Sequence, residues 1–292
     1  MVWNRATTWW PTCCTPPTRP LPRGPVSLPE IIEVEYYRRA AEAAVSRTVS
    51  AVHAPDDWFI KGGADAAALS LALDGQAVVG VRRTGKLLMM DFGDSDGSPS
   101  AVLGLRFGMT GRLVVDDHAV IEKLEYSSAR VLPERRRFEL RFDNEGTLVI
   151  VDPRRLGGVE LNPDDSRLGP DAFELASGEL AAALDGSRTS LKARLLDQHR
   201  VAGLGNLLVD EILWRTGLDP GREARSLDGA EQEKLAEAIR STVIELAERG
   251  GSHTGDLHLA RVRGGSCPRD GELLDRRTIG GRTTYSCPQH QH

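Results

Sequence analysis

The chain has 292 residues, 40% of them hydrophobic, and carries a formal net charge of −5 at pH 7. This length suits two modest domains with a small appendage, and the lack of a long apolar run predicts a soluble, cytoplasmic protein without membrane partners. Four cysteines, of which Cys267 and Cys287 lie near the end, suit a reducing compartment and argue against a disulfide framework.

The first 27 residues differ in composition from the rest of the chain. They hold six prolines and three of the five tryptophans but no Lys, Asp or Glu. The prolines exclude a helix or a central strand, and the apolar core of a secretory signal is missing. We expect residues 1–28 to be a disordered or mis-assigned extension, with the codon of Leu28 as the true start, so that Pro29 becomes the N-terminus. A proline-broken organellar presequence is the alternative.

A helix over residues 33–46 is followed by a series of short β-rich runs. The runs cover residues 77–82, 86–92, 101–107, 112–115, 138–142 and 147–151, with the turn Asn144-Glu145-Gly146 between the last two. Closely spaced strands with turn residues between them are typical of an antiparallel sandwich. The sequence therefore predicts a β-sandwich domain with a flanking helix over residues 29–162.

Residues 163–251 change to a helical pattern. The last helix is opened by a capping box of Asp228 and Glu231 and is closed by Gly250-Gly251. We expect a helical domain with its clearest helices over residues 190–198, 207–216 and 231–249.

Residues 252–292 are rich in Arg and Gly and end in a Cys-containing hairpin. Although the chain is acidic overall, residues 188–200 hold four Lys/Arg against one Asp, and residues 261–282 hold six Arg against three acids. A phosphate backbone responds to such local positive patches more than to net charge, because salt screens distant charges. The charge distribution therefore favours a nucleic-acid partner.

Four motifs follow one another along most of the chain. They are Pro29-Glu30 with Glu33 and Glu35; Val151-Asp152-Pro153-Arg154-Arg155; Gly203-Leu204-Gly205-Asn206 followed by Asp210-Glu211; and Arg282 five residues before Cys287. On these motifs, residues 28–292 resemble the formamidopyrimidine-DNA glycosylase and endonuclease VIII family of bacterial base-excision repair. The resemblance implies an α+β fold with a catalytic antiparallel β-sandwich, a helix-two-turn-helix DNA-binding domain and a terminal zinc-ribbon-like β-hairpin.

The resemblance assigns the chemistry to the start of the sandwich. A terminal Pro29 carries a secondary amine that is partly neutral near pH 7 and can attack C1′ of a damaged nucleotide. Glu30 can protonate the sugar ring oxygen, Glu33 lines the same pocket, and Lys86 reaches a phosphate near the lesion. Without the other motifs, the glutamates also fit helix-dipole carboxylates, and Lys86 also fits a lysine that protects an edge strand.

The same resemblance implies residues that fill the gap left by an extruded nucleotide. Met109, Arg154 and Leu156 take this role, next to Arg155. The family commonly has an aromatic residue at the position of Leu156, and leucine stacks less well on bases. Met109 taken alone also fits a core or loop methionine.

Phosphate contacts are implied for Lys192, Asn206 and Arg282. The glycines of residues 203–206 let the backbone approach closely, and exposed N–H groups at the start of the next helix form an anion site beside the Asn206 amide. A plain turn between two helices is the alternative for this motif.

The terminal hairpin keeps the family's Cys-x2-Cys spacing with altered residues. The four positions are Cys267, Asp270, Cys287 and His290. Zinc accepts carboxylate and imidazole as well as thiolate, so the set is chemically able to hold one structural Zn²⁺. A degenerate finger held by packing alone is the alternative, and no redox or nucleotide cofactor is expected.

The short connection before Cys267 bears on the substrate. Only fifteen residues separate Gly251 from Cys267, whereas typical formamidopyrimidine enzymes have a longer insert there that closes over an oxidised purine. We therefore expect weak 8-oxoguanine activity and a preference for ring-opened purines, oxidised pyrimidines or abasic sites.

The sequence thus predicts a bifunctional DNA glycosylase and abasic-site lyase, acting as a monomer on damaged double-stranded DNA at the bacterial nucleoid. Two alternatives stay open. One is a non-catalytic damaged-DNA-binding protein of the same family, in which Pro29 never becomes an amine. The other is a general helix-two-turn-helix nucleic-acid module whose β domain serves another purpose.

Overall fold

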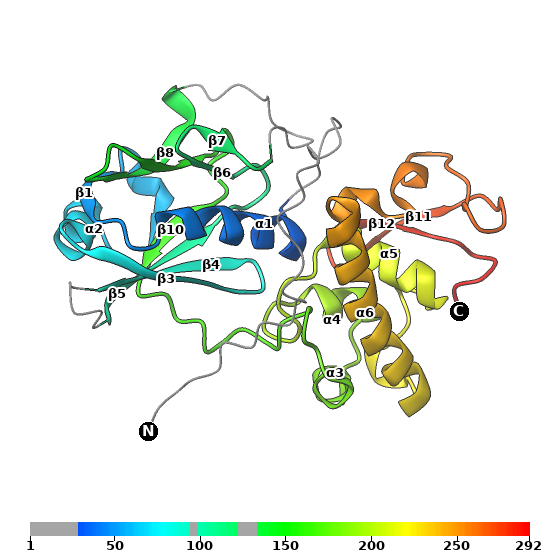
Figure 1. Cartoon of the computed structure of the whole chain (residues 1–292). Helices are drawn as coiled ribbons and strands as arrows, with labels where there is room; N and C mark the ends of the chain where they lie inside the picture. The colour runs from blue at the N-terminus through cyan, green and yellow to red at the C-terminus, as the bar shows by residue number, and fades with distance from the viewer. Residues whose placement is uncertain (1–28, 94–98, 122–132) are drawn as a thin grey trace.

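Two five-stranded sheets face each other in the first half of the chain and enclose its larger apolar core (Figure 1). The computed structural model describes residues 29–93, 99–121 and 133–292. One sheet has the strand order β1-β8-β9-β6-β7, and the other has β2-β10-β5-β4-β3. The strand bounds are β1 Val49–His53, β2 Ile60–Lys61, β3 Ala77–Thr84, β4 Leu87–Gly93, β5 Pro99–Arg106, β6 Arg112–Val115, β7 His118–Ala119, β8 Arg136–Phe142, β9 Thr147–Val151 and β10 Gly158–Leu161.

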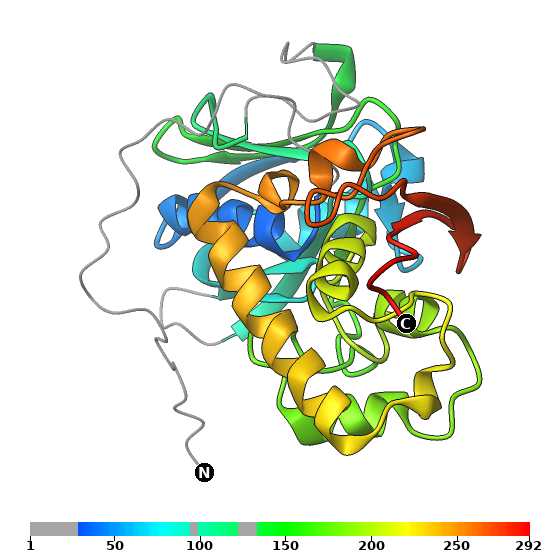
Figure 2. The same cartoon turned by 90° about the vertical axis from the view of Figure 1, so that its right-hand side faces the viewer.

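Helices occupy the second half of the chain around a separate apolar core. Figure 2 looks onto this half and shows α6 as a long rod across it, with the red end of the chain to one side. The capping box of Asp228 and Glu231 begins α6, and Gly250 ends it in the left-handed conformation (φ 112°). The bounds are α3 Ser177–Leu184, α4 Leu191–Leu196, α5 Asn206–Thr216 and α6 Gly229–Arg249; two helices of the first half are α1 Ile31–Ala41 and α2 Ala66–Leu73.

A two-stranded hairpin closes the chain and packs against α5. Its strands are β11 Asp275–Ile279 and β12 Arg282–Ser286. A small third core lies between the hairpin and α5, centred on Trp214 and Cys267. The short 3-10 turns are η1 Glu42–Ala44, η2 Asp57–Phe59, η3 Pro133–Arg135, η4 Ala224–Ser226, η5 Ser252–Thr254 and η6 His258–Ala260.

Helix α1 belongs to both large cores. Its first residues, Ile31 and Ile32, are fully buried among the helices of the second half. Val34 and Tyr37, one turn further on, pack between the two sheets instead, and Figure 1 shows α1 running between them. Since each half buries part of α1, the helix joins the two halves and fixes the place of the residues that precede it.

The fold class predicted from the sequence is confirmed, with three local differences. Strands at residues 112–115 and 147–151 match the expected bounds. The expected helix over 33–46 ends at Ala41 and continues as η1, and the sandwich includes one parallel pair, β2 with β10. The sequence also missed several short elements: β1, β2, β7, β10, α2 and α3. Among the described residues, no helix combines the length and apolarity that a membrane crossing requires.

Candidate active site

Glu30 lies just before α1 and binds the N-terminus of α5. Its carboxylate accepts hydrogen bonds from the backbone N–H groups of Gly205 (3.0 Å), Leu207 (2.9 Å) and Leu208 (3.1 Å). Pro29 and Glu30 are both buried. The anion site predicted for a phosphate at this helix start is therefore occupied by the protein's own carboxylate, because a helix N-terminus binds whichever anion is held closest.

The two glycines of the Gly203–Asn206 motif are required by this contact. A Cβ on Gly205 would lie 2.2 Å from the carboxyl carbon of Glu30, and one on Gly203 would lie 2.4 Å from Cδ1 of Ile31. Gly203 also adopts a left-handed backbone (φ 109°), which favours glycine. The motif thus leaves room for the segment that begins at Pro29 to pack against the start of α5.

Glu33 is the second buried carboxylate beside Pro29. It accepts bonds from the backbone N–H of Glu30 (2.9 Å) and from both the N–H and the hydroxyl of Ser252 (2.8 and 2.9 Å). Burial raises the pKa of Glu33 to about 7, with a further contribution from the charge of Glu30. Burial also raises the pKa of Glu30, against the opposing charge of Lys86 and the N–H bonds from α5. Both groups can therefore carry a proton nearer neutral pH than ordinary glutamates do.

Lys86 and Arg282 bring positive charge toward these carboxylates. Lys86 is half-buried at the turn between β3 and β4; burial lowers its pKa, whereas the charges of Glu30 and Glu33 raise it. Arg282 is exposed at the start of β12, and its charge acts on Lys86. The structure thus gathers Pro29, Glu30, Glu33, Lys86 and Arg282 around one region between the sandwich and the helical half.

Glu35, the third glutamate of the first motif, has a structural position. Arg83 pairs with Glu35 (3.1 Å) and with Asp171 (2.6 Å), and Asp171 also accepts the N–H of Gly85 (2.7 Å). These contacts tie the turn that carries Lys86 to α1 and to the helical half. Asp171 was not identified from the sequence, because no local motif marks it.

Asp152 brings together the two loops with the predicted gap-filling residues. Its carboxylate accepts bonds from the Thr110 hydroxyl (2.5 Å) and from the N–H groups of Arg154 (3.1 Å) and Gly157 (2.8 Å). The backbone at Gly108 approaches Leu156 so closely that a Cβ there would lie 2.5 Å from its carbonyl carbon. Met109 is half-buried, whereas Arg154 and Leu156 are exposed on the neighbouring loop.

The side chain of Arg155 pairs with Asp56, an acid that no sequence motif marks. Its guanidinium pairs with the carboxylate of Asp56 through two hydrogen bonds (2.7 and 2.5 Å), and its backbone is left-handed (φ 56°). Arg155 therefore connects the loop after β9 to the turn η2.

Lys192 is not on a phosphate-facing surface, which corrects the sequence-based prediction. Its side chain is fully buried and pairs with the equally buried Asp210 (2.6 Å), which also holds Arg261 (2.8 Å). The lysine further donates to the carbonyl oxygen of Thr283 (3.2 Å), and so does the amide of Asn206 (3.1 Å). These two residues fasten β12 to α4 and α5, because neighbouring acids and carbonyls satisfy their donors inside the protein.

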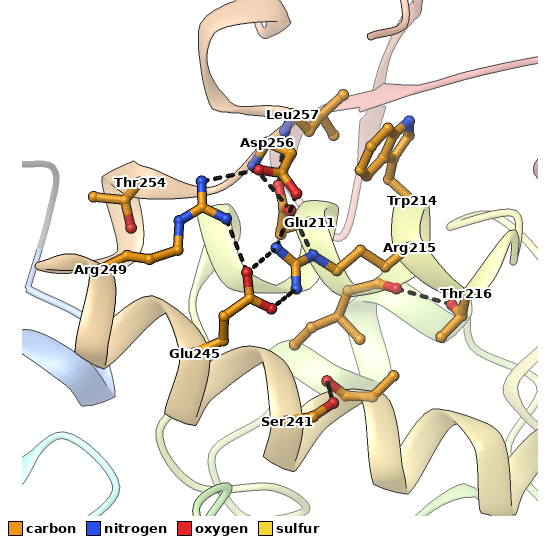
Figure 3. A network of polar contacts seen from close by, with 12 residues as sticks. Glu211, Trp214, Arg215, Thr216, Ser241, Glu245, Arg249, Thr254, Asp256 and Leu257 are labelled. Carbon is orange, nitrogen blue, oxygen red and sulfur yellow. Dashed lines mark hydrogen bonds and ion pairs between the residues drawn. The ribbon is translucent and has the colours of Figure 1, made fainter. Parts of the chain in front are cut away.

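Glu211, the neighbour of Asp210, anchors a second polar network (Figure 3). Its carboxylate accepts the N–H groups of Asp256 (3.0 Å) and Leu257 (2.9 Å) and pairs with Arg215 (2.7 Å). Figure 3 shows Arg215 between this group and Glu245 of α6. The Asp210-Glu211 pair of the third motif therefore holds the segment after α6 in place rather than contacting solvent.

The four predicted metal ligands come together at the base of the hairpin. One donor atom from each of Cys267, Asp270, Cys287 and His290 lies within 4.8 Å of all the others. Tetrahedral zinc with nitrogen and sulfur ligands requires ligand atoms about 3–4 Å apart. Both cysteines are buried, and burial raises the pKa of Cys287 to about 11, which a bound metal ion would oppose.

The surroundings of this cluster fit a cation. Nε2 of His290 lies 3.3 Å from the carbonyl oxygen of Trp214, which only accepts, so Nε2 carries the proton. Nδ1 then faces Oδ2 of Asp270 at 2.8 Å, and two such acceptors need a proton or a metal ion between them. The indole N–H of Trp214 and the backbone N–H of Arg269 donate to Sγ of Cys267 (3.3 and 3.4 Å), as outer hydrogen bonds commonly do around metal-bound thiolates.

The fold and the site define a helix-two-turn-helix protein in which a sandwich presents a proline and two buried carboxylates to the helical half. Two family models match the chain: the formamidopyrimidine-DNA glycosylase N-terminal domain over residues 28–159 and the formamidopyrimidine-DNA glycosylase H2TH domain over residues 168–257. The chain belongs to the formamidopyrimidine-DNA glycosylase family.

Similar proteins cover nearly the whole described chain. A formamidopyrimidine-DNA glycosylase of Cereibacter sphaeroides is 33% identical, with 89% of this chain and 99% of that protein covered. One of Streptococcus pyogenes is 31% identical, with 90% and 98% covered. The structure is also similar to that of Lactococcus lactis Fpg (MutM) in a complex with DNA containing an oxidized pyrimidine, at 25% identity and a TM-score of 0.74, over 90% of this chain and 100% of that one.

Proposed function

We propose that this protein is a bifunctional DNA glycosylase and abasic-site lyase that uses the amine of a terminal Pro29. The observation that carries the proposal is the position of Pro29. This residue is buried and directly precedes Glu30, whose carboxylate binds the N-terminus of α5 and whose backbone N–H binds Glu33. Two carboxylates with raised pKa values beside a secondary amine are suited to covalent acid–base chemistry.

The proposed reaction begins when the Pro29 nitrogen attacks C1′ and the bond to the damaged base breaks, the base leaving with a proton. Protonation of the ring oxygen, the role proposed for Glu30, opens the sugar and leaves an iminium at C1′. Loss of a C2′ proton then gives an enamine, whose electron pair expels the 3′ phosphate. Lys86 and Arg282 would hold the phosphates while Met109, Arg154 and Leu156 fill the gap in the duplex.

The proposed substrates are ring-opened purines, oxidised pyrimidines and abasic sites in duplex DNA, with weak activity on 8-oxoguanine. Between Gly251 and Cys267 the chain forms only the short turns η5 and η6. A segment of this kind leaves little chain to close over a large oxidised purine. Comparing release rates from matched duplexes that differ only in the damaged base tests this preference, and a rate fastest on 8-oxoguanine would refute it.

We also propose that Cys267, Asp270, Cys287 and His290 hold one structural Zn²⁺. Both cysteines would bind as thiolates, with Asp270 and His290 completing the tetrahedron. Bound zinc would fix the hairpin that carries Arg282 but would take no part in the reaction.

The experiment that tests the function compares two forms of the protein, each released from a fusion. One begins at Pro29, and its matched control retains Leu28, which turns the same nitrogen into an amide. Borohydride is added to each with duplex DNA containing an abasic site. The proposal expects a covalent adduct with the first form and none with the second.

Other outcomes separate the alternatives. Tight, lesion-selective binding by both forms without an adduct would identify a damaged-DNA-binding protein. Binding that ignores lesions would identify a general nucleic-acid module. An equal adduct with both forms would move the nucleophile away from Pro29. Mass spectrometry of the natively expressed protein would show whether the form that begins at Pro29 is made.

A further inference from the structure

Trp58 is an exposed aromatic side chain beside the loop that carries Leu156. Its side chain is 67% exposed, whereas Tyr37, Phe59 and Phe107 are buried in the sandwich. Leaving an indole in water forgoes a large apolar burial. Trp58 lies on η2, the turn that leads into β2, and no step of the proposed reaction uses it.

Several contacts lock η2 to the loop after β9. Asp56, two residues before Trp58, holds Arg155 through two hydrogen bonds (2.7 and 2.5 Å). On the other side of Trp58, Phe59 packs so close to Gly157 that a Cβ on that glycine would lie 3.2 Å from the ring. The turn that bears Trp58 is thus joined to the residues on both sides of Leu156, which is itself 48% exposed.

The ammonium group of Lys61 lies over one face of the Trp58 indole. It lies 4.8 Å from the ring centroid and donates to the carbonyl oxygen of Trp58 (2.5 Å). This cation–π contact orients the ring without covering its other face. A planar ligand stacking on Trp58 would take that other face, with the positive charge of Lys61 nearby for a phosphate.

We propose that Trp58 stacks on the base left unpaired opposite the extruded nucleotide and supplies the aromatic surface that Leu156 lacks. This inference rests on the proposed function. A leucine wedge separates base steps but stacks weakly, whereas an indole stacks on any base because each base presents a π-face. The link through Asp56 and Arg155 holds the indole in register with the wedge.

The test uses the form that begins at Pro29, to which the proposed function applies, and a duplex with 2-aminopurine opposite a tetrahydrofuran abasic-site analogue, which resists cleavage. In the parent protein, stacking on Trp58 should quench the 2-aminopurine fluorescence. In Trp58→Ala the probe should stay bright, and affinity for this duplex should fall about fivefold to a hundredfold. Trp58→Phe should retain most of the quenching and affinity.

Two further variants complete the design. Adding Leu156→Phe to Trp58→Ala should restore much of the lost affinity, because an aromatic then returns to the wedge. Leu71→Ala, which removes a 90% exposed side chain on α2, should change nothing. Unchanged affinity and quenching in Trp58→Ala, with the parent still preferring abasic over intact DNA, would overturn this inference alone. A parent without that preference would overturn the proposed function and this inference together.

Discussion

Replacing Lys192 by methionine tests whether this lysine stabilises the interior or contacts DNA. Lys192 and Asp210 are both fully buried, and their charged atoms lie 2.6 Å apart. Removing one partner of a buried pair leaves the other charge without compensation and commonly costs about 3–5 kcal/mol. Asp210 would keep Arg261 at 2.8 Å, so we expect a loss near the lower end, about 3 kcal/mol.

The loss would be measured as the free energy of unfolding in urea, followed by circular dichroism. A second substitution in the same protein, Asp210→Asn, removes the unpaired carboxylate. The double variant should therefore be more stable than the sum of the two single losses predicts, since neighbouring partners are not additive. An additive result would show that the pair contributes little.

DNA binding separates the structural role from the phosphate contact. Each phosphate neutralised by a protein cation contributes about −0.9 to the slope of log K against log salt concentration. The slope should be unchanged in Lys192→Met and should become shallower by about one phosphate in the matched control Arg282→Gln, since Arg282 is exposed. Normal stability of Lys192→Met with a shallower slope would refute the reasoning.

Three further variants, one of them with a matched control, test the site. Burial raises the pKa of Glu33 from 4.5 to about 7, so between these pH values the folded state keeps a proton that the unfolded state releases. The free energy of unfolding should therefore fall by up to about 3 kcal/mol as pH rises from about 4.5 to about 7. Urea unfolding of Glu33→Gln should lack this fall, and parallel pH profiles of the two proteins would contradict the assignment to Glu33. Gly205→Ala should displace the Glu30 carboxylate, lower the free energy of unfolding by about 3 kcal/mol or more and abolish base release. The control Gly229→Ala, where a Cβ meets nothing within 4 Å, should be neutral or slightly stabilising in the same urea unfolding measurement. His290→Ala should lower the zinc content measured by mass spectrometry and the melting temperature; a metal-free parent would contradict the zinc proposal.

The glycine motif at residues 203–206 was predicted correctly as an anion site, but the anion itself was not. Its glycines and its place before a helix predict a close backbone approach and an anion at the helix start. Which anion arrives there was not predictable, because Glu30 lies far away in the chain and reaches α5 only in the folded protein. The predicted phosphate site in fact binds the carboxylate of the protein's own Glu30.

Lys192 and Asp56 illustrate the same limit for charged residues. A lysine within a basic stretch of sequence is most simply read as solvent-facing, yet Asp210, Arg261 and Thr283 surround this one. Asp56 and Trp58 carry no recognisable motif, and their position beside the loop after β9 follows from the pairing of β2 with β10.

Local sequence patterns predicted the strands at residues 112–115 and 147–151, the capped helix α6 and the spacing of four residues that could hold a metal ion. These features depend on local periodicity, capping and spacing, which a chain carries from residue to residue. The burial of particular charges, the place of α1 in two cores and the contact of Glu30 with α5 became apparent from the folded protein alone. Burial and long-range pairing depend on which distant segments meet, and that is a property of the whole fold.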